Sequence, residues 1–338
     1  MTVQQLSLED FTEQVSSQHT DVIGAKLGGS ILGFSDEWFA EASNLIQPKP
    51  PIRDATKFVY SGAWYDGWET RRHNSEEYDW VIIKFGVSSA KLIGAEIDTA
   101  FFNGNHAPAI SIEALNSDTD DVLNDKKWDV VFDKVECGPS QRHFFKIAEL
   151  SKVYTHAKLK MYPDGGIARF RLYGDVVPNF QTLSVDSVID YAAVQNGGVA
   201  VSFSDQHFGT ADNLLLPGRG HDMSDGWETK RSRTAGHVDW VIIKLGTTVN
   251  IKEVVVDTAH FRGNFPNRIS LKAINTDELK PSYDTDKWVS LLGEEKTYAD
   301  KEHVFKDLLN NDAAYTHVAL TIIPDGGVKR VRVLGTKS

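Results

Sequence analysis

The sequence predicts an all-β protein built from two antiparallel β-sandwiches related by internal duplication. The first observation is a motif that occurs twice, as DGWETRR at 66–72 and as DGWETKR at 225–231. The copies are 159 residues apart, which is the length of a whole domain and not of a solenoid repeat. The second observation is a series of short β-branched runs separated by Gly/Pro turns, and the third is that no stretch predicts a long helix.

The predicted elements follow the same order in both copies. A polar lead-in comes first, with one helical turn expected within 7–14. We place the domain boundaries as lead-in 1–20, first repeat 21–176, linker 177–188 and second repeat 189–338. The first repeat carries about ten additional residues, 51–60, which we expect in a surface loop because insertions are tolerated there.

Each motif is followed by residues typical of sandwich strands. The runs DWVIIKFG at 79–86 and DWVIIKLG at 239–246 predict strands buried on both faces. The sequence Pro-Asp-Gly-Gly, at 163–166 and 324–327, predicts a hairpin turn, because proline presets the turn and glycine supplies positive φ. In the strand after the first of these turns, Arg169 and its i+2 neighbours should share one face.

Bulk composition is that of a soluble globular protein. The 338 residues are 41% hydrophobic and 25% charged, and no apolar run reaches the length of a membrane span. The single cysteine, Cys137, excludes internal disulfides and a thiolate zinc cage, and the polar start of the chain lacks the pattern of a signal peptide. We therefore expect a cytoplasmic protein.

The net charge of −11 argues against nucleic acid as a partner, since such binding depends on a basic surface. An anionic ligand would have to be held by individual arginines against the overall field of the protein. The positions of the arginines are therefore informative.

Several duplicated motifs resemble a known family. A tryptophan-led strand ending in Lys-x-Gly, then Asp-Thr-Ala with Gly-Asn behind it, and then Pro-Asp-Gly-Gly before Arg-x-Arg is similar to the galactose-binding-like jelly roll. More specifically, FSDEWF, YDGWETRRHN, DTAFFNGNHAP and YPDGGIARFRLYG resemble the allantoicase family, as do FSDQHF, GRGHDMSDGWETKR, DTAHFRGNFP and IPDGGVKRVRVLG. The resemblance runs from about residue 21 to residue 335.

The resemblance implies an enzyme of purine breakdown and nitrogen use. An allantoicase is a hydrolase of C–N bonds in linear amidines that converts allantoate and water to (S)-ureidoglycolate and urea. Each half of such an enzyme is a jelly roll, the subunits form homo-oligomers, and the substrate is a small molecule. Composition and periodicity are compatible with this function but do not predict it.

The reaction requires a proton for the departing nitrogen and a base for water, so carboxylates and histidines in the duplicated loops are the candidate catalytic residues. They are Glu69, Glu228, Asp66, Asp225, His221, His260 and His106. The substrate carboxylate needs an arginine, and planar ureido groups need donors and acceptors at fixed angles. The candidate substrate-binding residues are Arg72, Arg231, Arg262, Asn105, Asn264, Asp98 and Asp257.

A packing interpretation stands beside each of these assignments. Trp68 and Trp227 are as well explained by burial at a sandwich edge as by function, and an acid at a strand end can simply fix the following loop. Lone loop histidines are usually polar surface, and the pairs His143/His303 and His156/His317 read as structural.

The second repeat is better equipped for an anion. Residues in its loops differ from the first repeat, with His260 and Arg262 in place of Phe101 and Asn103. Arg219 and His221 lie near them in the sequence, and we therefore favour the second repeat as the one that carries the chemistry. Whether one repeat or both hold an active site stays open.

No cofactor and no metal site is predicted, since the sequence has no His-Glu-x-x-His, no closely spaced His/Asp ladder, no phosphate loop and no dinucleotide fingerprint. A divalent metal held by distant loops stays open. Two other functions also stay open, because fold alone does not fix function: a non-catalytic tandem carbohydrate-binding module, and a hydrolase or lyase acting on ureidoglycolate or another ureido compound.

Overall fold

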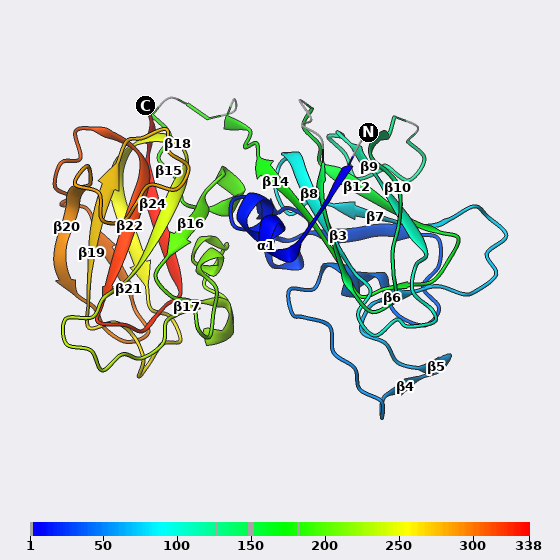
Figure 1. The fold of residues 1–338 in the computed structure, drawn as a ribbon. Coiled ribbons are helices and arrows are strands. Elements are labelled where there is room, and N and C mark those ends of the chain that lie inside the picture. Colours follow the sequence, from blue (N-terminus) through cyan, green and yellow to red (C-terminus); the bar gives the residue numbers. More distant parts are fainter. Residues whose placement is uncertain (1–2, 126, 148–151, 181–182, 185) are drawn as a thin grey trace. The chain divides into compact units, whose positions relative to one another are not determined.

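The computed structural model describes residues 3–125, 127–147, 152–180, 183–184 and 186–338 and consists mainly of antiparallel strands (Figure 1). Strands account for 43% of the structure and helices for 9%, which confirms the all-β prediction. The chain divides into two compact units, Met1–Pro178 and Asn179–Ser338. The division falls inside the stretch in which the linker was expected.

The first unit is a sandwich of two five-stranded antiparallel sheets. One sheet has the order β1 (Val3–Leu6), β11 (Arg142–Ile147), β8 (Ala90–Asp98), β14 (Arg169–Val176) and β2 (Thr20–Asp21). The other has the order β10 (Asp129–Glu136), β9 (Ala109–Leu115), β12 (His156–Tyr162), β7 (Asp79–Lys84) and β3 (Ser30–Phe34).

The lead-in is packed onto the first of these sheets. Its helix α1 (Leu8–Phe11) is capped by Ser7 and continues into η1 (Thr12–Ser16). Phe11 and Val15 pack on the strand residue Phe144. The lead-in thus covers apolar surface on the solvent side of the sheet.

The second unit repeats this topology around one long strand. β18 (Asp239–Asp257) pairs with β22 (Ala314–Ile323) through its first half and with β24 (Arg330–Lys337) through its second half. In the first unit the corresponding pairings are divided between β7 and β8. The other strands of the large sheet in the second unit are β15 (Ile189–Asp190), β16 (Val199–Phe203), β19 (Arg268–Ile274), β20 (Val289–Lys296) and β21 (Glu302–Phe305).

The strands predicted to be buried on both faces or nearly so are buried at their centres, while Trp80 and Lys84 in β7 are half-buried. Val81, Ile82 and Ile83 in β7, like the equivalent 241–243 in β18, have no exposed surface. Their β-branched side chains fill the sandwich on one side and lie under covering loops on the other.

The hairpin prediction for the two Pro-Asp-Gly-Gly turns is wrong. β12 and β14, which flank the turn at 163–166, belong to different sheets and do not pair with each other. The turn instead carries the chain from one sheet to the other, with Gly165 at φ 143°. Immediately after the turn, β13 (Gly166–Ile167) pairs with β6 (Trp68–Glu69), which belongs to the duplicated DGWET motif.

The second unit has the same small pairing, between β17 (Trp227–Glu228) and β23 (Gly327–Val328). In both units the motif tryptophan is fully buried. Trp68 donates its Nε1 hydrogen to the carbonyl of Asp36 at 2.8 Å. The packing role considered for these tryptophans is therefore the one that the structure displays.

The insertion expected in a surface loop forms a small hairpin, β4 (Phe58–Val59) and β5 (Gly62–Ala63), which extends away from the first sandwich in Figure 1. The other helical elements are single 3-10 turns: η2 (Ala25–Leu27), η3 (Ala42–Ile46), η5 (Val194–Asn196), η6 (Ala211–Leu215) and η7 (Met223–Asp225). Among the described residues, no helix has the length and apolar character needed to cross a membrane.

Candidate functional site

Three segments of the first unit meet around Glu69. The motif strand β6 supplies Glu69 and, in the loop that follows, Arg72. The loop after β8 supplies Asn105, whose Nδ2 donates to Glu69 Oε1 at 2.6 Å. The turn between the sheets supplies Asp164, which accepts a hydrogen bond from Arg72 Nη1 at 2.9 Å. Predicted residues of both classes, catalytic and substrate-binding, therefore lie in one cluster.

Glu69 is the buried acid of this cluster. Only 6% of its surface is exposed, and burial raises its pKa, while the hydrogen bond from Asn105 and the charge of Arg72 act in the opposite direction. A carboxyl group with a raised pKa holds its proton more readily and can deliver it to a leaving group.

Arg72 is fixed by the loops on either side of it. Its Nη2 donates to the carbonyl of Gly104 at 2.9 Å, in addition to the ion pair with Asp164. The second oxygen of Asp164 accepts from the backbone N–H of Asn74 at 3.0 Å. His73, which lies between Arg72 and Asn74 in the chain, adopts a left-handed conformation with φ 64° and has an exposed side chain.

The second unit contains the same arrangement in a more open form. Asn264 Nδ2 donates to Glu228 Oε1 at 2.5 Å, and Arg231 Nη2 lies 3.5 Å from the carbonyl of Gly263. Asp325 takes the place of Asp164 and accepts from the N–H of Ser232. Glu228 is only partly buried, so the acid of the second unit is less desolvated than Glu69.

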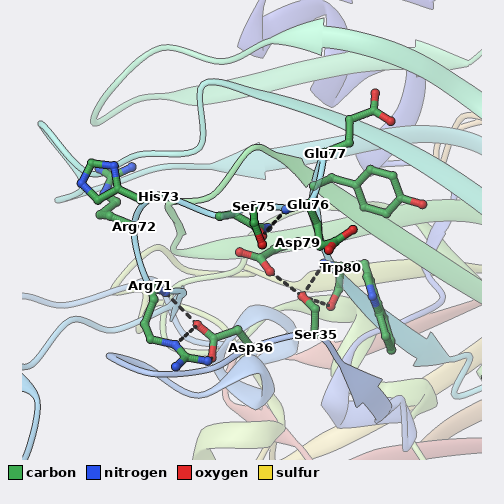
Figure 2. Close-up of a pocket in the computed structure, with 12 residues that line it drawn as sticks. Ser35, Asp36, Arg71, Arg72, His73, Ser75, Glu76, Glu77, Asp79 and Trp80 are labelled. Atoms are coloured by element: carbon green, nitrogen blue, oxygen red, sulfur yellow. Dashed lines mark hydrogen bonds and ion pairs between the residues drawn. The ribbon is translucent and has the colours of Figure 1, made fainter.

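A cavity of about 680 Å³ adjoins the first cluster and is drawn in Figure 2. It lies between the loop 71–80 and Ser35–Asp36, and Arg72 belongs to its lining. Its polar wall is ordered by hydrogen bonds, from the Ser35 hydroxyl to Asp79 Oδ1 at 2.7 Å and from the Arg71 N–H to Asp36 Oδ2 at 2.8 Å. A small polar ligand would find both carboxylates and guanidinium groups there.

Sequence reasoning named Arg72 but missed its partner Asp164 and the rest of this loop. Asp164 was read only as a turn residue. The signal was available, because an acid stands at this position of the turn in both copies.

Asp66 and Asp225, predicted as catalytic, are held by arginine. Arg169 Nη2 donates to Asp66 Oδ2 at 2.8 Å, and Arg330 Nη2 donates to Asp225 Oδ2 at the same distance. Asp225 is also ion-paired with the fully buried Lys329. These contacts tie each motif loop to the last strand of its unit.

Asp98 and Asp257, predicted as substrate-binding, fix the loops that follow them. They accept the backbone N–H of Ala100 and Ala259 at 2.8 and 2.9 Å. Asp257 is further bound by both Nε and Nη2 of Arg219, at 2.7 and 2.9 Å. The loop-fixing interpretation describes these contacts.

None of the candidate histidines is hydrogen-bonded to Glu69 or Glu228 in the described structure, although His106 and His260 lie in the loops that carry Asn105 and Asn264. His106 Nδ1 is 3.2 Å from the carbonyl of Asn103, and His221 is exposed beside Asp222. The backbone N–H of His260 donates to Asp300 Oδ1 at 2.8 Å, and Arg262, another predicted residue, lies 3.4 Å from the same carboxylate. The four histidines that were read as structural are buried: His143, His156, His303 and His317.

Within the ranges that the structure describes, no group of three or more His, Cys, Asp or Glu side chains is placed to hold a metal ion.

Each of the two jelly-roll units presents a glutamate bonded to an asparagine, with an arginine nearby, and this repeated arrangement defines a class of internally duplicated proteins. Comparison with known proteins identifies the class. The family model described as the allantoicase repeat matches residues 20–177 and again 189–338. The chain belongs to the allantoicase family.

Individual relatives agree over almost the whole length. The chain is 61% identical to the allantoicase of Saccharomyces cerevisiae over 322 residues, covering 93% of both chains. It is 54% identical to the allantoicase of Neurospora crassa over 340 residues, covering 98% of this chain and 96% of that one. A crystal structure of the Saccharomyces cerevisiae enzyme superposes with a TM-score of 0.87 at 55% identity, covering 99% of this chain and 100% of the other. The resemblance to the allantoicase family and the predicted fold class are therefore confirmed.

Proposed function

We propose that this protein hydrolyses allantoate to (S)-ureidoglycolate and urea. Membership of the family and identity of 50% or more to three relatives named as allantoicases, one of them as probable, support this activity. The structural observation that carries the proposal is the Glu69–Asn105 pair beside Arg72, which joins a desolvated acid to a guanidinium group. The relatives do not favour the carbohydrate-binding alternative.

In this proposal one group, Glu69, serves first as the acid and then as the base. The protonated Glu69 carboxyl gives its proton to the ureido nitrogen as the bond from that nitrogen to the central carbon breaks. Urea leaves, and the central carbon takes the oxygen of water. The hydroxyl group of the water stays on the central carbon, and the Glu69 carboxylate accepts the other proton, which restores its initial protonated state.

The neighbours of Glu69 have positioning roles in this scheme. Asn105 holds one carboxyl oxygen so that the other faces the substrate. Arg72 binds the substrate carboxylate, which its planar guanidinium group recognises in a bidentate manner. His106 in the first unit, and His221 and His260 in the second, are retained as supporting proton carriers.

The loops of the second repeat favoured that half from the sequence, but we assign the proton-transfer step to the first unit because Glu69 is the more buried of the two acids. The pair Glu228–Asn264, with Arg231, is proposed to hold a second substrate-binding site, whose loops Asp225 and Asp257 keep in position through their contacts with Arg330 and Arg219. Arg262 remains a candidate for anion binding there.

The test is to replace each acid by its amide in the full-length chain and to measure urea release from allantoate. Glu69→Gln should lower kcat by at least ~10²-fold, the typical contribution of general acid–base catalysis. Glu228→Gln is the matched control, and a rate loss confined to this variant would move the chemistry to the second unit. Assays with allantoin and with ureidoglycolate, in which urea and ammonia are both measured, distinguish the protein from other ureido hydrolases. Absence of urea release from allantoate would contradict the proposal.

We also propose that the protein works as a homo-oligomer in the cytoplasm. The family resemblance supports the assembly. The compartment is supported by a single cysteine, whose burial raises the pKa of the thiol to about 12. Light scattering coupled to size exclusion, and cell fractionation, test the two statements separately.

A further inference from the structure

One histidine of the first unit lies in the wall of the cavity beside Arg72 and has no role in the scheme above. His73 belongs to the lining of this cavity, and its side chain is exposed. Figure 2 shows His73 and Arg72 together on the loop 71–80. Among the described residues the imidazole has no hydrogen-bond or ion-pair partner, so both of its nitrogens are available to a ligand.

The loop of the first unit has one residue more than that of the second between the motif arginine and the next fixed point. This fixed point is a backbone N–H that donates to the acid of the Pro-Asp-Gly-Gly turn. In the first unit Asn74 donates to Asp164 at 3.0 Å. In the second unit Ser232, which directly follows the motif arginine, donates to Asp325 at 2.8 Å.

The side chains confirm this correspondence. Asn74 Oδ1 accepts the backbone N–H two residues further on at 2.9 Å, and Ser232 Oγ accepts the N–H two residues further on at 3.1 Å. The same turn therefore begins at Asn74 in one unit and at Ser232 in the other. His73 is the additional residue of the first unit.

The additional residue is held in a conformation that favours glycine. Both of its chain neighbours are fixed by Asp164, which binds the side chain of Arg72 and the backbone N–H of Asn74. With φ at 64°, His73 adopts the left-handed region, where glycine has no steric cost and a residue with a Cβ does. Residues that are kept in such conformations cluster at ligand sites, because the position of the side chain matters there.

The imidazole is chemically suited to a ureido group. A neutral histidine ring has one N–H donor and one acceptor nitrogen, whereas a ureido group has a carbonyl acceptor and N–H donors. Arg72, the preceding residue, is the one to which we assign the substrate carboxylate. Allantoate carries its carboxylate and its ureido groups on the same carbon, so neighbouring side chains can bind the two kinds of group together.

We propose that His73 is a substrate-binding residue of the first unit, which recognises a ureido group of the molecule whose carboxylate is bound by Arg72. This inference rests on the proposed function and deepens it. His73 transfers no proton in the scheme and determines specificity, since it distinguishes a ureido acid from a carboxylate that lacks the ureido group.

The first variant is His73→Gly in the full-length chain. Glycine adopts a φ of 64° readily, so the loop keeps its course and only the imidazole is lost. The KM for allantoate should rise at least ten-fold with a smaller change in kcat, and unfolding should require at least the wild-type concentration of urea. A wild-type KM in this variant would overturn the proposal, because glycine preserves any role that is purely structural.

Two further variants separate the imidazole from the backbone. His73→Asn retains a donor and an acceptor and tolerates the left-handed conformation, so its KM should lie below that of His73→Gly. Asn310→Gly is the matched control, since Asn310 is exposed, has a φ of 49° and belongs to the second unit. It should keep the wild-type KM, and a rise equal to that in His73→Gly would overturn the proposal.

Inhibitors test which part of the substrate His73 contacts. N-carbamoylglycine has a carboxylate and one ureido group, and acetate has the carboxylate alone. In competition with allantoate, inhibition by N-carbamoylglycine should be weaker in His73→Gly than in the wild type, whereas inhibition by acetate should be the same in both. Equal weakening of both inhibitors would contradict recognition of the ureido group.

Binding without turnover separates this inference from the proposed function. Allantoate is titrated by calorimetry into Glu69→Gln and into the double variant that also carries His73→Gly, and the double variant should bind at least ten-fold more weakly. Equal affinities would overturn the role of His73 and leave the hydrolysis standing. A wild-type chain that releases no urea would contradict the hydrolysis, and weaker binding by the double variant would still support His73. No binding by Glu69→Gln or the wild type would overturn both.

Discussion

Asn105 lies 36 residues after Glu69 and donates a hydrogen bond to its carboxylate, and Asn264 lies 36 residues after Glu228 and does the same. The contact has thus been kept in both halves, although the loops that carry the asparagines differ in sequence, as at Phe101 and His260. In the first unit this hydrogen bond favours the charged form of Glu69 and so opposes the rise in pKa that burial causes.

Removal of this hydrogen bond should shift the pH dependence of the enzyme. In Asn105→Ala the pKa of Glu69 rises further, because the group that lowers it is lost. The alkaline limb of the profile of kcat/KM against pH, which reports loss of the catalytic proton, should then move to higher pH. Asn264→Ala is the control, and a limb that moved only in this variant would contradict the assignment to the first unit.

Gly67 should tolerate no side chain. An added Cβ would lie 2.5 Å from the carbonyl oxygen of Ile167 and 2.8 Å from the ring of Phe102. Gly67→Ala should lower the free energy of unfolding by about 1–3 kcal/mol through overpacking. Gly104→Ala, where a Cβ has no neighbour within 4 Å, should unfold at nearly the wild-type urea concentration.

Trp68 should be among the most costly residues to truncate. It is fully buried and donates a hydrogen bond to Asp36. Trp68→Ala should cost about 3–5 kcal/mol in urea-induced unfolding followed by circular dichroism. Trp38→Ala, at a tryptophan that is 47% exposed, should cost much less; comparable losses would show that burial is not the cause.

His317 should make the second unit sensitive to acid. Burial lowers its pKa from 6.5 to about 4, so the unfolded chain takes up a proton before the folded one does. The stability due to the neutral ring is complete above pH 6.5 and is lost as the pH falls toward 4, by up to about 3 kcal/mol. Denaturant titrations at several pH values should show a shallower decline in His317→Gln, whereas the exposed-site variant His207→Gln should follow the wild type.

Much of the fold could be predicted because the duplication exposes what packing requires. A run of β-branched residues such as 79–86 can be accommodated in a sandwich only as a central strand, and the structure buries the middle of this run in β7. The turn at 163–166 could not be placed, because proline and glycine specify a reversal but not which sheet receives the next strand. Local sequence contains no information on that choice, which depends on the long-range pairing of β13 with β6.

The site could be predicted in composition but not in its connections. Glu69, Asn105 and Arg72 were named separately, and the structure joins them. Asp66 and Asp98 were named for the same reasons, yet their charges are used by Arg169 and by the backbone of Ala100. Sequence spacing does not show which group an acid will bind. The partner of Asp66, Arg169, is about a hundred residues away, whereas the partner of Asp98, the backbone N–H of Ala100, is two residues away.

The unbroken strand β18 gives the second unit a different mechanical character from the first. A motion that slides one sheet of this unit over the other has to bend a single 19-residue strand that is hydrogen-bonded on both sides of the bend. In the first unit the corresponding strands are separate, and residues 85–89 connect β7 to β8. The two sheets of the second sandwich are thus coupled directly through the backbone of one strand, whereas those of the first are coupled through a connecting segment.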